Sequence, residues 1–246
     1  MVILDNAFIP NELIFMDSET DFASMLVERF TCYHRRSYVC KSGVGDVLIG
    51  AAAQIAEYNG VENASHIKDK IVEMTHLNET IYATGIASSY QSTATKSGAF
   101  INDDMIANVC KHHVTKIPYQ ISRFAQDLAG GLMVTMPSEQ DFRSEEIGHL
   151  LEKYLKGRAD VSTESRMRIL RLIENMTLGR NAVGYLTESM HGAGSPQAQR
   201  IQIARQMQLD LKKQLAKELA GVEKRDREKL TTEIAGYFGK VFDTDV

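Results

Sequence analysis

From about residue 20 onward, apolar residues recur every three or four positions, and this period limits the possible folds more than any other feature. The clearest run is Ile67, Ile71, Met74, Leu77 and Ile81. Such spacing gathers apolar side chains on one face of a helix, and that face is buried by packing against other helices. Similar runs follow along the chain, with no internal repeats and no low-complexity linker. The sequence therefore predicts an all-α bundle of six or seven helices.

Capping and breaking residues divide the chain into these helices. Ser, Thr, Asp and Asn accept hydrogen bonds from first-turn N–H groups, and Gly commonly follows the last turn. Pro118 lacks a backbone donor, so we expect a kink or break at that point. Beyond a helical stretch over 22–41, the expected helices run from Asp46 to Tyr58, from Asn63 or Ser65 past Ile81, from about Asp103 to Leu128, from Ser144 to Gly157, from Ser162 or Thr163 to about Ser189, and from Ser195-Pro196 to Gly221.

The first residues differ from the rest of the chain. VIL and FIP are short β-prone runs, and Pro10 with Asn11 indicates a turn. An isolated strand is not stable alone. We therefore interpret residues 1–18 as the edge of a β-sheet that belongs elsewhere, followed by a helical domain over 19–246. In the tail beyond about residue 222, a charge run precedes alternating apolar positions, which indicates a solvated or subunit-bridging helix.

Charge and cysteine content narrow the class of protein. The formal net charge is −4, so no positive field argues for nucleic acid as a partner. The three cysteines are unevenly spaced and favour a reducing cytoplasm over a secreted disulfide framework. No signal peptide and no membrane-spanning apolar run is evident, so we expect a soluble cytoplasmic protein.

The stretch CYHRRSYVCK, residues 32–41, concentrates reactive side chains. On a helix turning about 100° per residue, His34, Tyr38 and Lys41 fall on one narrow stripe. Cys40 lies about 120° from His34, so both could bind one metal only if the helix unwinds locally near Cys40, which the closely following Gly43 and Gly45 would permit. The stripe could be the wall of an active site. It could equally be a set of partly exposed polar residues beside a buried thiol.

Four segments together resemble a known enzyme family. They are VILDNAFIPNELIF, YHRRSYVCKSGVGDVLIGAA, VCKHHVTKIPYQISRFAQDLAGGLMVTMPSEQDF and AVGYLTESMHGAGSPQAQRIQIARQ. In order and without large gaps, they are similar to 4-hydroxybutyryl-CoA dehydratases, relatives of the flavin-dependent 4-hydroxyphenylacetate 3-hydroxylases. The resemblance implies the carboxy-terminal helical bundle of an acyl-CoA-dehydrogenase-like fold, preceded by a remnant of the central β domain. It implies a lyase and isomerase that uses FAD and a 4Fe–4S cluster to convert 4-hydroxybutyryl-CoA to crotonyl-CoA.

The same resemblance implies roles for particular residues. His34 and Cys40 match two cluster ligands, Tyr38 and Lys41 match neighbouring active-site residues, and Glu188 matches a glutamate of the substrate pocket. The segment with Gln126, Gly130 and Gly131 corresponds to one that faces the flavin. Gly192 and Gly194 precede a capped helix start that could bind a cofactor phosphate. From the residues alone, Glu188 could be a surface carboxylate and Gly130-Gly131 a helix C-cap.

Two departures from the family pattern shape the functional prediction. A single Val39 stands where the family has two glycines between tyrosine and cysteine, and the two other cysteine ligands are absent. We therefore expect activity on an acyl-CoA substrate only in complex with an amino-terminal-half polypeptide, in a homo- or hetero-oligomer resembling a tetramer. Two alternatives remain open. One is half of a reduced-flavin aromatic hydroxylase, and the other is a cofactor-free helical scaffold.

Overall fold

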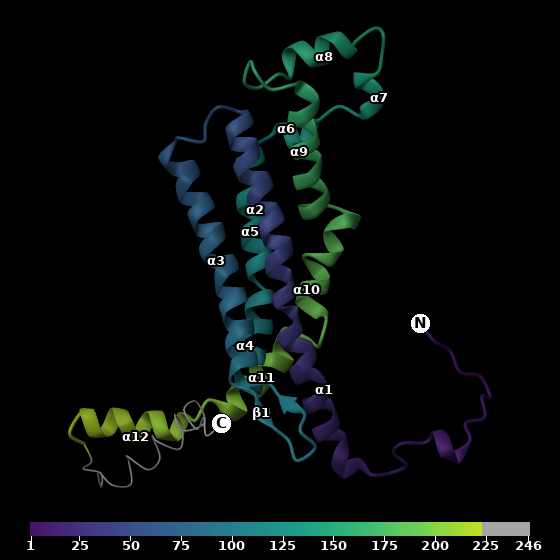
Figure 1. Cartoon of the computed structure of the whole chain (residues 1–246), viewed down its shortest axis with the longest axis vertical. Coiled ribbons are helices and arrows are strands. Elements are labelled where there is room, and N and C mark those ends of the chain that lie inside the picture. The colour runs from purple at the N-terminus through teal and green to yellow at the C-terminus, as the bar shows by residue number, and fades with distance from the viewer. Residues whose placement is uncertain (223–246) are drawn as a thin grey trace.

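The computed structural model describes residues 1–222 and shows a bundle of long helices (Figure 1). The long helices are α1 (Ala23–Ser37), α2 (Lys41–Tyr58), α3 (Ser65–Tyr90), α4 (Asp104–Val114), α5 (Ile117–Ala129), α9 (Thr163–Thr177), α11 (Pro196–Gln206) and α12 (Leu209–Leu219). Shorter helices are α6 (Leu132–Thr135), α7 (Glu139–Phe142), α8 (Gly148–Tyr154) and α10 (Thr187–His191). The predicted all-α bundle is confirmed.

Helix α2 is central, because it packs against α3, α5 and α9. Its buried face carries Leu48, Ala52 and Ile55, all fully enclosed. Met74 and Ile81 of the predicted apolar run are also fully buried, whereas Ile71 and Leu77 flank the core as half-buried side chains. The helical period therefore identified the buried face of α3 correctly.

A small β-hairpin joins α3 to α4 at one end of the bundle. Strand β1 (Thr93–Ala94) pairs antiparallel with β2 (Phe100–Ile101). The neighbouring Asp103 side chain accepts a hydrogen bond from the Ile106 N–H and so caps α4. These contacts fix the start of α4, which carries residues of the functional site.

Residues 1–18 are not paired as a strand within this structure, so their assignment to the edge of a sheet carried elsewhere stays a prediction. These residues form no strand, and nearly all are exposed, with one 3-10 turn η1 (Asn11–Leu13). A strand is stabilised by hydrogen bonds to a neighbouring strand. Within the described residues no strand pairs with this segment, because β1 and β2 pair with each other, so the β-prone residues remain unpaired.

The break expected at Pro118 is confirmed, because the segment over 103–128 breaks at Thr115-Lys116 and Pro118 lies in the first turn of α5. Several other predicted helix boundaries are corrected. The helix predicted to reach Ser189 ends at Thr177, because Gly179 adopts a φ of +64°. The 3-10 turn η4 (Arg180–Gly184) and α10 follow.

Three further boundaries shift by a few residues. The helix expected to begin at Asp46 begins at Lys41, and Asp46 accepts a hydrogen bond from Asn78. The helix expected from Ser144 begins at Gly148. The last one breaks at Gln208, which has a left-handed φ of +47°. The predicted helix beyond residue 222 lies outside the described residues.

The continuous helical run Thr20–Tyr58 is long and apolar enough to span a membrane by length and composition. A core helix of a soluble protein passes the same test. In this bundle, the apolar face of α2 is packed against three other helices.

Candidate functional site

The helix winds more tightly at the junction of α1 and α2. Tyr38, Val39 and Cys40 form the 3-10 turn η3 (Tyr38–Cys40), and α2 begins at Lys41. A 3-10 turn advances about 120° per residue where an α-helix advances about 100°. Two such steps bring Cys40 about 40° closer to the face of His34. The change in winding therefore occurs at the predicted place, near Cys40, but it is a tightening of the helix rather than an unwinding.

Val39 fits into this junction because Gly85 of α3 has no side chain. A Cβ atom on Gly85 would overlap Val39 Cγ2, far inside contact distance. The valine that replaces the family's two glycines is therefore seated on α3. It helps to hold α1 and α2 against that helix.

The structure places His34 and Cys40, the two predicted cluster ligands, on α1 and in the η3 turn. The Nδ1 atom of His34 is buried without a hydrogen-bond partner, and Cys40 is a free, exposed cysteine. Within residues 1–222, no group of three or more His, Cys, Asp or Glu side chains is placed to hold a metal ion. The role of His34 and Cys40 as ligands stays a prediction, and any further ligands would have to come from outside the described residues.

Tyr38, Lys41 and Glu188 meet as predicted, although Glu188 comes from α10, far along the chain. The Tyr38 hydroxyl donates a hydrogen bond of 2.5 Å to Glu188 Oε1. The Lys41 ammonium forms an ion pair with Glu188 Oε2 and donates a hydrogen bond of 2.6 Å to the carbonyl of Gly184. We call these three residues the Tyr38–Lys41–Glu188 cluster. The ring of His34 lies beside it, 5.5 Å from the Tyr38 ring between centroids.

The cluster holds its groups in defined protonation states. Burial acts to raise the pKa of Glu188, but hydrogen bonds from Lys41 and Tyr38 outweigh it and lower that pKa. Burial and the adjacent Glu188 carboxylate raise the pKa of the Tyr38 phenol. At neutral pH the cluster therefore presents a carboxylate, which pairs with the Lys41 side chain, and a neutral phenol. Such a set can donate and accept protons at a bound substrate.

Gly192 lies directly against this cluster. A Cβ atom on Gly192 would overlap the Tyr38 hydroxyl oxygen and lie 2.9 Å from Glu188 Oε1. The second glycine, Gly194, has a φ of +100°, which disfavours other residues. Both glycines thus have a packing or backbone requirement within this chain, and their binding of a cofactor stays a prediction.

Sequence reasoning missed a buried cation behind the cluster. Lys111 of α4 is fully buried, and its Nζ lies 4.3 Å from the centroid of the Tyr38 ring. It donates hydrogen bonds to the carbonyls of Ser189 and Met190. A signal existed in the sequence, because Lys111 falls on the same helix face as the buried Ala107 and Val114. A lysine on an apolar stripe is rarely there by chance.

A second missed residue, Arg35, fixes the loop after α10. It is buried, and it donates a 3.1 Å hydrogen bond to the carbonyl of Ala193 and a 2.8 Å bond to Asn108 Oδ1. Gln199 of α11, also fully buried, donates to the carbonyl of Gly194 over 3.1 Å. Donors on α1 and α11 therefore hold the loop that carries the two glycines.

Gln126, Gly130 and Gly131 are not part of this arrangement. Gln126 donates a 3.3 Å hydrogen bond to the carbonyl of Thr177, at the end of α9. Gly130 ends α5 with a φ of +72°, which confirms the C-cap interpretation. These residues lie next to α6, toward the end of the bundle that bears α7 and α8 (Figure 1). Added Cβ atoms on the two glycines would meet nothing within 4 Å, so their role toward a flavin stays a prediction.

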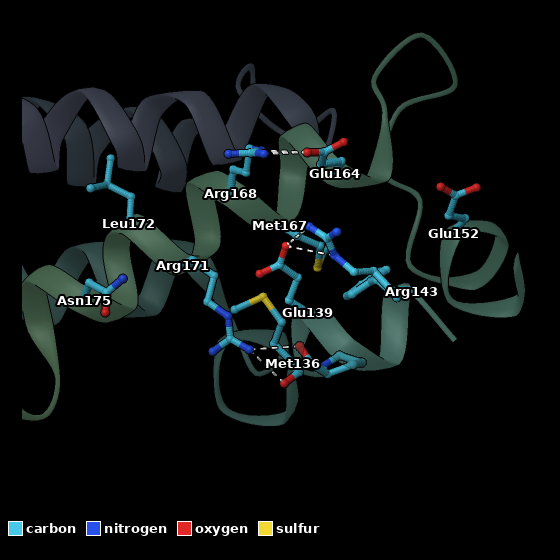
Figure 2. A pocket seen from close by; sticks show the side chains of 12 residues that line it. Met136, Glu139, Arg143, Glu152, Glu164, Met167, Arg168, Arg171, Leu172 and Asn175 are labelled. Carbon is cyan, nitrogen blue, oxygen red and sulfur yellow. Dashed lines mark hydrogen bonds and ion pairs between the residues drawn. The ribbon is translucent and has the colours of Figure 1, made fainter. Parts of the chain in front are cut away.

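A separate cavity of 720 Å³ lies among α7, α8 and α9, away from the cluster (Figure 2). Its arginines already have carboxylate partners: Arg143 pairs with Glu139, Arg168 with Glu164, and Arg171 with Glu174. Because these charges are matched within the protein, the described lining of the cavity offers no unpaired arginine for an anion.

The titration of Lys111 gives a testable pH dependence. Burial lowers its pKa from 10.5 to about 8, although the charge of Glu188 acts in the opposite direction. The unfolded chain then binds more protons between these two values, so the free energy of unfolding rises with pH across this window. The stability of the wild type relative to Lys111→Met is expected to increase by on the order of 3 kcal/mol from about pH 8 to pH 10.5. Urea unfolding of both chains measures the difference, and a constant difference would contradict the assignment.

Comparison with known proteins agrees with this fold. Residues 23–221 match the family described as "HpaB: 4-hydroxyphenylacetate 3-hydroxylase C terminal". The chain is 57% identical over 232 residues to the 4-hydroxybutyryl-CoA dehydratase/vinylacetyl-CoA-Delta-isomerase of Clostridium aminobutyricum, covering 91% of this chain and 47% of that protein. It is 23% identical over 181 residues to the 4-hydroxyphenylacetate 3-monooxygenase oxygenase component of Thermus thermophilus. That match covers 72% of this chain and 37% of that protein.

Solved structures lead to the same fold. An oxygen-tolerant archaeal 4-hydroxybutyryl-CoA dehydratase from N. maritimus superposes with a TM-score of 0.88 at 68% identity, covering 99% of this chain and 48% of that one. A second structure is the oxygenase component HpaB of 4-hydroxyphenylacetate 3-monooxygenase, complexed with FAD and 4-hydroxyphenylacetate. It superposes with a TM-score of 0.75 at 18% identity, covering 98% of this chain and 47% of that one. The second likeness confirms the acyl-CoA-dehydrogenase-like fold alone.

The chain thus spans about half the length of the curated relatives it matches. The matched region contains α1 to α12, including every member of the Tyr38–Lys41–Glu188 cluster. The family match therefore covers most of the described residues. This chain belongs to the 4-hydroxyphenylacetate 3-hydroxylase C-terminal family.

Proposed function

We propose that this chain is the carboxy-terminal half of a 4-hydroxybutyryl-CoA dehydratase-like enzyme, which removes water from 4-hydroxybutyryl-CoA to give crotonyl-CoA and isomerises vinylacetyl-CoA. The observation that carries the proposal is the Tyr38–Lys41–Glu188 cluster beside His34, in a chain 57% and 68% identical to named dehydratases. Loss of water requires a proton acceptor and a proton donor at the substrate. The carboxylate of Glu188 and the phenol of Tyr38 can serve these roles.

The chain's own residues would also orient the substrate. Lys41 holds the Glu188 carboxylate in place, so one carboxylate oxygen is engaged by the ammonium and the other by the phenol. This fixes the direction from which a proton can be accepted. Positioning of this kind lowers the entropic part of the barrier.

Two cofactors belong to the proposal. The unpartnered His34 Nδ1 and the exposed Cys40 fit two ligands of a 4Fe–4S cluster, whose other ligands would come from the missing half. When bound, the cluster would supply Lewis-acid chemistry at the leaving hydroxyl, and FAD would supply one-electron redox chemistry. Gln126, Gly130 and Gly131 are proposed to face the flavin, and Gly192 and Gly194 are proposed to contact a cofactor phosphate.

An exposed apolar face supports a partner polypeptide. Along α1 and the residue before it, large apolar side chains at helical spacing are 47–64% exposed: Phe22, Met25, Leu26, Phe30 and Tyr33. The stripe continues into the candidate site, since the Phe30 ring packs edge-on against His34. Contiguous apolar surface of this kind is typical of an interface. We propose that the amino-terminal half of the enzyme, carried on another chain in a cytoplasmic oligomer resembling a tetramer, covers this face.

Reconstitution tests the proposed function. The chain is co-expressed with the product of an adjacent coding region and purified without oxygen, and iron, flavin and crotonyl-CoA formation are measured. A brown, flavin-containing complex that converts 4-hydroxybutyryl-CoA supports the proposal. A colourless, inactive complex removes it, and an iron-free flavin complex would instead favour an aromatic hydroxylase. Stable association without cofactor would favour a helical scaffold.

Two cysteine variants sharpen this test. Cys40→Ser is expected to lower the iron bound per complex, because it removes the exposed sulfur of the proposed ligand. Cys110→Ser is the matched control, since Cys110 is buried in α4 with its thiol directed to the carbonyl of Ile81. Equal iron content in both variants would exclude Cys40 as a ligand.

A further inference from the structure

Lys111 is the largest fully buried side chain in the described part of the chain. An ammonium without water around it is costly unless hydrogen bonds and charges compensate. Neither the predicted ligand set nor the proposed proton transfer uses this residue. Its contacts therefore indicate what the chain gains by burying it.

The Lys111 ammonium binds the end of α10. It donates to the carbonyl of Ser189, and to that of Met190 over 3.4 Å, the two residues directly after Glu188. The last carbonyls of a helix lack partners within the helix and carry its negative dipole end, so a cation there is stabilising. Because α10 has only five residues, Thr187–His191, it depends on such external contacts.

The same ammonium lies against the other half of the cluster. Its Nζ is 4.3 Å from the centroid of the Tyr38 ring, within the range of a cation–π interaction. Tyr38 comes from the α1–α2 junction and Glu188 from α10. One buried charge thus contacts both segments whose side chains form the 2.5 Å hydrogen bond.

We propose that Lys111 is a positioning residue of the Tyr38–Lys41–Glu188 cluster: it anchors the backbone after Glu188 and packs its ammonium on the Tyr38 ring, so that phenol and carboxylate stay in hydrogen-bond contact. The proposal is based on contacts within this chain. Only the measurement of activity that tests it rests on the proposed function. Neutralising Lys111 releases α10 and changes the surroundings of the Tyr38 hydroxyl together.

Lys111→Met tests this in the full-length chain, because methionine keeps much of the length and removes the charge. Two readouts are independent of activity. Hydrogen exchange of the amides of Met190 and Gly192, which bond within α10, is expected to rise at least about tenfold. The ¹³Cζ resonance of Tyr38, assigned with Tyr38→Phe, is expected to shift because the cation leaves its ring.

Gln199→Met is the matched control. It removes another fully buried donor from the same loop, at the carbonyl of Gly194, and it leaves the Tyr38 ring untouched. It should raise exchange near Gly194 without moving the Tyr38 resonance. If both variants shift that resonance equally, Lys111 acts only through general packing, and the proposal is overturned.

The reconstituted complex adds a third readout. Lys111→Met is expected to lower kcat by about 10- to 100-fold with little change in KM, because misplaced reacting groups slow the chemical step. If the wild-type complex has no dehydratase activity, the proposed function fails. The hydrogen-exchange and ¹³Cζ measurements still test whether Lys111 positions the cluster. If the variant does not fold, nuclear Overhauser contacts between Lys111 and the Tyr38 ring are measured in the wild type instead. Their presence supports the proposal, and their absence overturns it.

Discussion

Replacing Glu188 by glutamine is expected to lower the turnover of the reconstituted enzyme by about 10²- to 10⁴-fold, the range typical for loss of a proton-transfer group. Glutamine can still accept a hydrogen bond from Tyr38, but it gives Lys41 no counter-charge and cannot accept a proton from substrate. The pKa of Tyr38 should fall toward its ordinary value, since the Glu188 carboxylate helps to raise it. Stopped-time assays of crotonyl-CoA formation and ¹³Cζ titration of Tyr38 measure these effects.

Stability should change far less than activity in Glu188→Gln. The Glu188 side chain is 42% exposed, so its ion pair with Lys41 is screened and contributes about 1 kcal/mol. Glu139→Gln is the control, because Glu139 pairs with Arg143 on the surface of α7, remote from the cluster. Turnover of this control should stay within about twofold of the wild type. Equal losses in the two variants would show that Glu188 has no special part in the reaction.

Replacing Gly192 by alanine is expected to separate Tyr38 from Glu188. The new methyl group would overlap the Tyr38 hydroxyl, so the phenol or the loop must move. The backbone at Gly192, with φ −60° and ψ 146°, already suits alanine, so the effect is steric. We expect a loss of about 1–3 kcal/mol in the free energy of unfolding and at least about 100-fold in turnover.

Gly50→Ala provides the comparison for Gly192→Ala. Gly50 lies inside α2, and an added Cβ atom would meet nothing within 4 Å. Alanine should therefore stabilise the helix, by up to about 1 kcal/mol. Unfolding in urea and the Tyr38 ¹³Cζ resonance distinguish the two variants. An unchanged resonance in Gly192→Ala would mean that the loop moves and the phenol does not.

Local sequence patterns predicted only part of the site. His34, Tyr38 and Lys41 share a stripe because they lie within eight residues, where helix geometry alone sets their directions. Their association with Glu188 came only from the family resemblance, since by itself that residue could be a surface carboxylate. The same limit explains the errors in predicted helix ends. The end of α9 at Thr177, for example, depends on how neighbouring helices pack.

Sequence by itself determined the all-α class and the buried face of α3, because a period of 3.6 residues acts within each helix and requires no knowledge of its neighbours. Only the tertiary structure decided that Lys111 lies behind Tyr38, that Val39 sits on Gly85, and that Gly192 must lack a side chain. These contacts join segments far apart in the chain. Such pairings arise from the packing of whole helices, and no local pattern of residues encodes them.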